Sequence, residues 1–142
     1  MSWVSPTAAV ERDEKRLREA VADGYNVAFG DFSDPRIWEP LALHGRKVTV
    51  LTAPLFEVSR ELGPAVRQLF PELKRIAVVR SQEDAERFRS IGVLPVIDRS
   101  MPSGLDLAAL VLAELGVDSD RIGNWMRRQQ KHALSGEDAA AA

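Results

Sequence analysis

Short runs of β-branched and apolar residues alternate with helix-like segments along most of this sequence. The runs that have the length and composition of strands are residues 7–10, 27–29, 47–52, 75–79 and 93–97. Parallel strands need crossover connections between them, and helices usually supply those crossovers. The alternation therefore predicts an α/β fold with a mostly parallel sheet and helices on its faces.

The helical segments carry recognisable start and stop signals. They span residues 12–23, 57–70, 82–91, 103–115 and 119–132, and a shorter helix begins at Pro35 after Ser33 or Asp34 as its cap. Gly24, Gly92 and Gly116 follow three of the helices as stop signals. Pro95 lies inside the last strand, and because proline lacks the ladder donor we expect that strand at an edge of the sheet.

Composition excludes several classes of function. The 142 residues suffice for one ordinary domain, and the formal net charge of −2 argues against a nucleic-acid partner. Cysteine is absent, which removes disulfides, thiolate metal sites and cysteine nucleophiles, and His44 and His132 are too few for a multi-histidine metal site. The longest nearly apolar stretch, residues 105–115, is too short to span a membrane, and no secretory signal is present, so we expect a cytoplasmic protein without membrane insertion.

No catalytic constellation is visible. The sequence lacks Gly-x-Ser-x-Gly, a Walker loop and His-Glu-x-x-His, and neither histidine has an activated serine near it in sequence. An aspartyl-phosphate receiver would need an aspartate after the third strand, where this chain has Thr52-Ala53-Pro54. We therefore predict that the protein is not an enzyme and holds no metal.

Ligands of open α/β sheets bind beyond the carboxyl ends of the strands. The residues at those ends are Glu11, Gly30-Asp31, Thr52-Ala53-Pro54, Arg80 and Asp98-Arg99. A carboxylate can accept hydrogen bonds from both hydroxyls of a ribose, and a guanidinium matches a phosphate. An acid in such a place can equally cap the following helix, and Arg80 can equally pair with a neighbouring acid, so both interpretations stay open.

Two segments, VERDEKRL at 10–17 and GYNVAFGDFSDP at 24–35, make the chain resemble a known family. The similarity continues through the strand at 48–52, PELKRIAVVR at 71–80 and Ile91-Gly92-Val93. Together they resemble the regulator-of-potassium-conductance domain (TrkA-N), the nucleotide-binding module of Trk and Kef potassium transport systems. The resemblance implies a Rossmann-like fold with a C-terminal crossover-type helix.

The resemblance also implies a site for NAD(H) or an adenine nucleotide such as AMP or ATP. The positions that it assigns to cofactor binding are Glu11, Arg12, Gly30, Asp31, Thr52, Ala53 and Arg80. Glu11 matches the acid that holds the adenosine ribose, where the family more often has aspartate. Asp31 matches the aspartate beside the adenine, Thr52 and Ala53 match a strand end that lines the cleft, and Arg80 matches a basic residue that faces the ligand.

Residues 119–132 resemble the helix through which these domains dimerise. Its apolar stripe of Ile122, Trp125 and Met126 suits a dimer interface, and it suits packing onto its own domain as well. The expected organisation is a truncated Rossmann-like domain at 1–116, a dimerisation helix at 117–134 and a disordered tail at 135–142.

One departure from the family concerns the phosphate-binding loop. The family opens with a strand, a Gly-x-Gly-x-x-Gly loop and a helix, whereas the match here begins at the second strand. The first strand normally lies between the second and fourth, so its loss leaves two half-sheets with unpaired edges. Three arrangements could satisfy these unpaired edges. The strand ending at Glu11 could pair with the strand ending at Thr52, or a neighbouring chain could insert a strand. The third is that the sequence is a piece of a longer protein, and we favour this one.

The function that follows is a cytoplasmic, nucleotide-sensing regulatory domain of a potassium or cation/proton transport system. It would act through ligand-dependent geometry of a homodimer, with nucleotide binding weakened or lost, on a membrane transporter or channel subunit. The alternative is a non-binding assembly module that dimerises through the C-terminal helix. A dehydrogenase is disfavoured, because the chain lacks both the glycine loop and a substrate domain.

Overall fold

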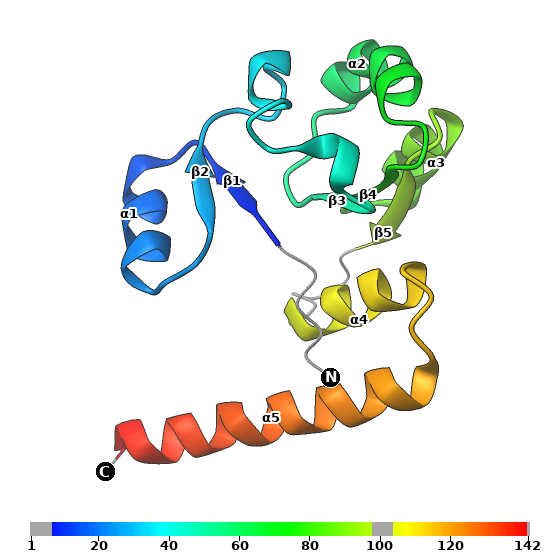
Figure 1. The fold of residues 1–142 in the computed structure, drawn as a ribbon. Coiled ribbons are helices and arrows are strands. Elements are labelled where there is room, and N and C mark those ends of the chain that lie inside the picture. Colours follow the sequence, from blue (N-terminus) through cyan, green and yellow to red (C-terminus); the bar gives the residue numbers. More distant parts are fainter. Residues whose placement is uncertain (1–6, 98–103, 142) are drawn as a thin grey trace. The chain divides into compact units, whose positions relative to one another are not determined.

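The structure is a computed structural model that describes residues 7–97 and 104–141. The described residues divide into two compact units, one of residues 7–46 and 55–73 and the other of residues 47–54, 74–97 and 104–141 (Figure 1). Each unit has its own parallel sheet. The predicted Asp98-Arg99 strand end and the predicted helix start at Ser103 lie outside the described residues.

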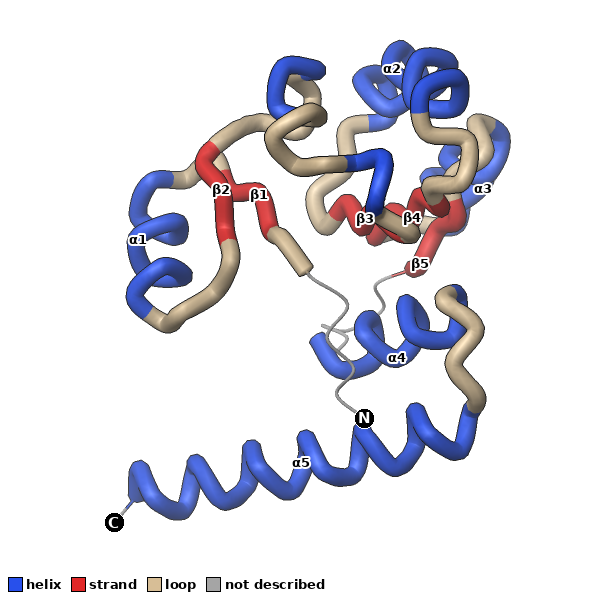
Figure 2. Tube along the Cα trace, in the orientation of Figure 1, coloured by secondary structure: helices blue, strands red, loops and turns tan. Residues whose placement is uncertain are grey.

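The first unit begins with a strand–helix–strand motif, drawn with its two strands in red in Figure 2. It comprises β1 (Ala9–Glu11), α1 (Glu14–Ala22) and β2 (Val27–Phe29). The strands pair in parallel, with Ala9 opposite Val27 and Glu11 opposite Phe29. Asp13 caps α1 by accepting a hydrogen bond from the Arg16 amide at 2.9 Å, and Gly24 follows the helix at a φ of +84°.

The core of the first unit lies between its short 3-10 turns and its long helix. These elements are η1 (Pro35–Ile37), η2 (Leu43–Gly45) and α2 (Phe56–Leu69). The buried cluster comprises Trp38, Leu41, Leu43, Val66, Phe70 and Leu73. Trp38 and Phe70 meet edge to face with ring centroids 5.9 Å apart, and Trp38 Nε1 donates to the Phe32 carbonyl at 3.1 Å. The indole is therefore buried without an unsatisfied donor.

The second unit contains a three-stranded sheet in the order β3-β4-β5. The strands are β3 (Val48–Leu51), β4 (Lys74–Val79) and β5 (Leu94–Ile97), and α3 (Gln82–Ser90) crosses from β4 to β5. The central strand supplies the core, with Ile76 and Ala77 at 0% exposure and Phe88 of α3 at 3%. The position of β5 at the edge of the sheet confirms the prediction drawn from Pro95.

Two further helices complete the second unit. α4 (Gly104–Glu114) packs against α5 (Ser119–Ala141). Lys74 Nζ donates to the last carbonyl of α4, on Glu114, at 2.7 Å, a favourable position for a cation. The backbone of α5 continues to Ala141, beyond the predicted end at His132 and through most of the predicted tail at 135–142. Alanine has the highest helix propensity, which accounts for the extension.

The described strands confirm the α/β class, because every pairing is parallel and helices flank both sheets. The described strands lie in two sheets, one of β1 and β2 and the other of β3, β4 and β5. Direct pairing between β1 and β3, one of the predicted alternatives, does not occur among the described residues. Within these residues, no helix is long and apolar enough to cross a bilayer.

Candidate functional site

The carboxyl ends of β1 and β2 bring four predicted site residues together: Glu11, Arg12, Gly30 and Asp31. The Gly30 amide donates to the Glu11 carbonyl at 3.1 Å, which extends the strand pairing by one step. Arg12 Nη1 lies 3.7 Å from Asp31 Oδ2, with both side chains largely exposed. The strand register therefore places two carboxylates and one guanidinium at the same edge of the first unit's sheet.

The Glu11 carboxylate is oriented by the backbone that follows it. Its Oε1 accepts hydrogen bonds from the amides of Arg12 and Asp13, both at 2.9 Å. Its other oxygen, Oε2, accepts no hydrogen bond within residues 7–97 and 104–141. A carboxylate held in this way has one oxygen fixed in place and the other available to a ligand hydroxyl.

Asp31 is held by the turn that it begins. Its Oδ1 accepts from the Ser33 hydroxyl at 2.7 Å and from the Ser33 amide at 2.9 Å. These two hydrogen bonds, aided by the nearby Arg12 guanidinium, lower the pKa of Asp31 below its ordinary value. Asp31 therefore stays ionised at neutral pH and offers a pure acceptor at the sheet edge.

Gly30 is needed for close packing and not for an unusual backbone angle. A Cβ atom built at this position would lie 3.3 Å from Cγ2 of Ile37 and 3.9 Å from Cγ1 of Val10. The first of these distances is shorter than an ordinary van der Waals contact. The absence of a side chain thus lets the segment after β2 run close to η1 and fixes where Asp31 begins its turn.

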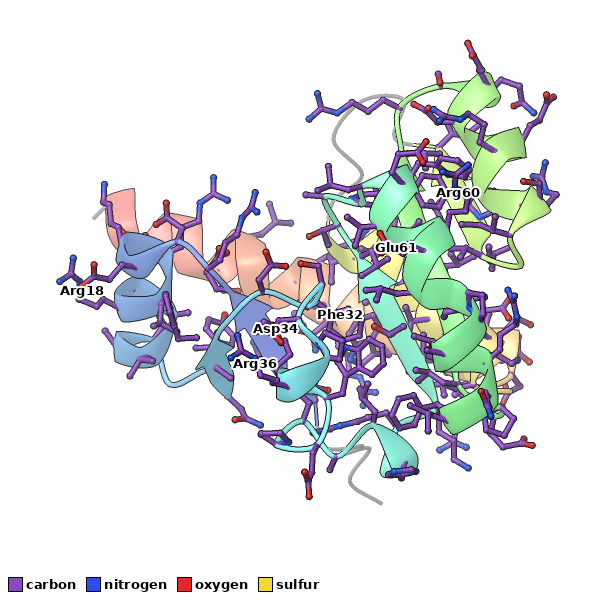
Figure 3. The ribbon with its side chains drawn as sticks, turned by 90° about the horizontal axis from the view of Figure 1, so that it is seen from above. Arg18, Phe32, Asp34, Arg36, Arg60 and Glu61 are labelled. Carbon is purple, nitrogen blue, oxygen red and sulfur yellow. The ribbon has the colours of Figure 1, made fainter. Side chains whose placement is uncertain are left out.

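A further ion pair follows Asp31 in the same loop. The Arg36 guanidinium donates through Nε and Nη2 to the Asp34 carboxylate, with Nη2 to Oδ2 at 2.7 Å, and Figure 3 shows the two side chains together. Hydrogen bonds from Arg36 lower the pKa of Asp34, which also caps η1 by accepting from the Arg36 amide at 3.0 Å. Of the two predicted caps, Ser33 and Asp34, the structure has Asp34. Sequence reasoning did not identify Arg36, although its spacing of two from Asp34 was visible.

The other predicted cofactor positions belong to the second unit. Thr52 and Ala53 follow β3, Arg80 follows β4, and all three residues are exposed. They lie at the carboxyl edge of their own sheet, where the sequence placed them. Their part in binding a cofactor stays a prediction.

The apolar stripe of α5 is partly used within its own unit. Ile122 is 9% exposed, whereas Trp125 and Met126 are half-buried. Because α5 packs against α4, the burial of Ile122 has an explanation within one chain. Its assignment to a dimer interface, with Trp125 and Met126, stays a prediction.

The described residues contain no cluster of three or more metal-ligating side chains. His44, one of the two histidines, is exposed and packs against the ring of Phe70 with centroids 4.8 Å apart. This contact accounts for His44 without a ligand role.

Comparison with known proteins decides the family. The family model of the TrkA-N domain matches residues 4–98, about two thirds of the chain. The chain belongs to the TrkA-N family. This confirms the family inferred from the sequence.

Two solved structures support the same fold, and a third is similar at a lower TM-score. The TrkA-N domain of the inner membrane protein ybaL from Escherichia coli superposes with a TM-score of 0.57 at 19% identity, over 76% of this chain and 77% of that one. The NAD(P)-binding domain of an exopolyphosphatase-related protein from Archaeoglobus fulgidus gives 0.53 at 18% identity, over 77% and 78% of the two chains. The AMP-bound Kef C-terminal domain of Shewanella denitrificans gives 0.48 at 17% identity, over 92% and 94%. None of the curated proteins matches this TrkA-N domain.

Proposed function

We propose that this TrkA-N domain is a non-catalytic, cytoplasmic regulatory domain that senses NAD(H) or an adenine nucleotide for a potassium or cation/proton transporter or channel. The observation that carries the proposal is the Glu11 carboxylate, which two amides hold at the end of β1 beside the ionised Asp31. A ribose offers two adjacent hydroxyl donors, and an adenine offers an amino group. Both are complementary to carboxylate acceptors on one sheet edge.

In the proposed complex each acid has its own part of the ligand. Glu11 accepts from the ribose through Oε2, which has no donor among the described residues, while Oε1 stays bound to the backbone amides. Asp31 accepts from the adenine amino group, and Arg12, 3.7 Å from it, limits the repulsion between the two acids. The relatives support this choice of ligand, since one solved structure of similar fold is described as an NAD(P)-binding domain.

We expect the affinity to be modest. None of the nine glycines forms a Gly-x-Gly-x-x-Gly pattern, so the sequence offers no such loop to a pyrophosphate. Binding would then depend on the ribose and base, which AMP, ATP and NAD share. We therefore expect these nucleotides to bind with similar dissociation constants.

Isothermal titration calorimetry with AMP, ATP, NAD and NADH tests the proposal. Glu11→Gln keeps an oxygen that can accept from the amides but removes the charge, and we expect it to weaken binding by roughly 10-fold or more. Glu39→Gln, an exposed acid of the same unit, is the matched control and should leave binding unchanged.

Two results would overturn nucleotide sensing. The first is the absence of heat for all four nucleotides, and the second is binding that Glu11→Gln and Glu39→Gln alter equally. An unchanged melting temperature of the Glu11→Gln variant would show that the substitution leaves the fold intact. The second result would then report on binding and not on folding.

The half-buried Trp125 and Met126 favour homodimerisation through α5, together with the neighbouring Ile122. Trp125→Asp should dissociate such a dimer in analytical ultracentrifugation. Dimerisation without any nucleotide effect on thermal stability would favour the alternative function, an assembly module that does not bind a ligand. A nucleotide at 100 times its dissociation constant should add about 2.7 kcal/mol to the stability, so the two functions are readily distinguished.

A further inference from the structure

We propose that Phe29 is the residue on which the nucleobase stacks at the candidate site, an inference that rests on the proposed nucleotide binding. Phe29 is the last residue of β2, and the strand register places it directly opposite Glu11, the last residue of β1. It is 66% exposed beside the acid that is proposed to hold the ribose. The family resemblance assigns no role to Phe29.

Glu11 and Phe29 project from the same face of the first unit's sheet. Side chains alternate between the two faces along a strand, and residues opposite each other on neighbouring strands share a face. Val10 packs against the buried cluster around Trp38, so Glu11 and Phe29 lie on the face that turns away from this cluster. Neighbouring strands are about 4.8 Å apart. The backbone positions that carry the carboxylate and the ring are therefore one strand spacing apart.

The exposure of Phe29 distinguishes it from the other phenylalanines of the chain. All five lie in the described ranges, and the other four are buried or half-buried. Phe32 and Phe70 also pack against other rings, whereas no ring contacts Phe29 among residues 7–97 and 104–141. An open aromatic face next to a carboxylate fixed by two amides is therefore available to a ligand.

The covalent structure of a nucleoside suits this pair of side chains. The base is joined directly to the ribose, so a ribose held by Glu11 brings the base to the neighbouring strand, where Phe29 lies. Asp31 follows Phe29 by two residues and is the acceptor proposed for the adenine amino group. The ring thus contacts the face of the base and the carboxylate its edge. Because every base has a π-face, Phe29 contributes affinity while Asp31 contributes the choice of base.

Tyr25 shows that exposure alone does not select Phe29. It is 69% exposed and precedes β2 by two residues, so it lies at the amino end of the strand. An extended backbone places it up to about 13 Å from Phe29. Ligands of open α/β sheets bind beyond the carboxyl ends of the strands, where Phe29 lies and Tyr25 does not. Tyr25 is therefore a matched control on the same strand.

Isothermal titration calorimetry with AMP tests the proposal on the full chain. Phe29→Leu keeps an apolar side chain but removes the ring, and we expect it to weaken AMP binding by roughly 10-fold. Phe29→Tyr keeps the ring and should bind within about twofold of the unmodified chain. Tyr25→Leu removes an equally exposed ring and should leave binding unchanged. Melting temperatures of the three variants show whether each one is folded.

Nuclear Overhauser effects between AMP and the protein test the geometry directly. We expect contacts from the adenine H2 and H8 protons to ring protons of Phe29, which are identified by their loss in the Phe29→Leu variant. A structural role of Phe29 would produce no such contacts.

The outcomes distinguish stacking from nucleotide sensing. AMP binding that Glu11→Gln weakens but that Phe29→Leu and Tyr25→Leu leave equally unchanged would overturn stacking on Phe29 and leave nucleotide sensing intact. Contacts from adenine to a different aromatic residue would do the same. The absence of heat for AMP and for the other nucleotides would overturn the proposed function, and this inference with it.

Discussion

β1 ends at the predicted site residue Glu11 and β4 is followed directly by the predicted site residue Arg80, but neighbouring strands support the two parallel strands differently. β4 lies between β3 and β5 and contains Ile76 and Ala77, which are 0% exposed. β1 pairs with β2 alone among the described residues and contains no buried residue. A strand with neighbours on both sides buries its side chains against flanking helices, whereas a strand with one neighbour stays partly open.

Within the first unit, the residues that stabilise the fold are therefore different from the residues of the candidate binding site. Its burial comes mainly from the cluster around Trp38 and Phe70, and not from β1 and β2. The residues of the candidate site are fixed by local hydrogen bonds, as when Glu11 accepts from the two amides that follow it. Substitutions at the site should therefore affect ligands more than folding.

The largest expected loss in the free energy of unfolding comes from a substitution in β4, the central strand of the second unit's sheet. Ile76→Ala removes a fully buried side chain, and we expect it to lower the free energy of unfolding by about 2–5 kcal/mol. The corresponding truncation in β1, Val10→Ala, removes a half-buried side chain and should cost only about 1 kcal/mol. Urea denaturation of both variants measures the contrast. Equal losses would show that β1 supports its unit as strongly as β4 does.

A smaller effect is expected where the candidate site touches the core. Gly30→Ala places a methyl group 3.3 Å from Cγ2 of Ile37, and such overpacking should cost about 1–3 kcal/mol. Gly45→Ala is the control, because nothing lies within 4 Å of a Cβ built there, and it should change stability by less than about 0.5 kcal/mol. Thermal and urea unfolding give both values. Similar losses in the two variants would contradict a tight contact at Gly30.

Much of the fold could be predicted because local sequence signals agreed with it. The alternation of apolar runs and helical segments located β1 to β5, and Pro95 correctly placed β5 at an edge. The end of α5 could not be located as well. Gly136 and the acids after it indicate a helix stop, while the terminal alanines favour helix, and the structure extends the helix to Ala141.

The candidate site was predictable in position but not in detail. Parallel pairing brings strand ends together, so the meeting of Glu11 with Asp31 at one edge follows from the order of the elements. Which partners each carboxylate takes depends on turn geometry that the sequence does not specify. The choice of Asp34 over Ser33 as the cap of η1, and the ion pair of Asp34 with Arg36, are of this kind.

The smallest expected effect concerns the charge of Asp31. Its pKa lies below the ordinary value of 3.8 chiefly because the Ser33 side chain donates to it, so the ionised form is favoured in the folded state. The contribution of ionised Asp31 to the free energy of unfolding is therefore fully present above the ordinary pKa, and it is lost as the pH falls through the lowered pKa of the folded state.

Ser33→Ala removes the hydroxyl but keeps the amide, and should raise the pKa of Asp31 in a carboxyl NMR titration. Ser90→Ala, whose hydroxyl donates to the Arg87 carbonyl, should leave that pKa unchanged. If both variants leave it unchanged, the turn does not hold the Asp31 charge, and the ionised acceptor proposed for the adenine amino group loses its structural basis.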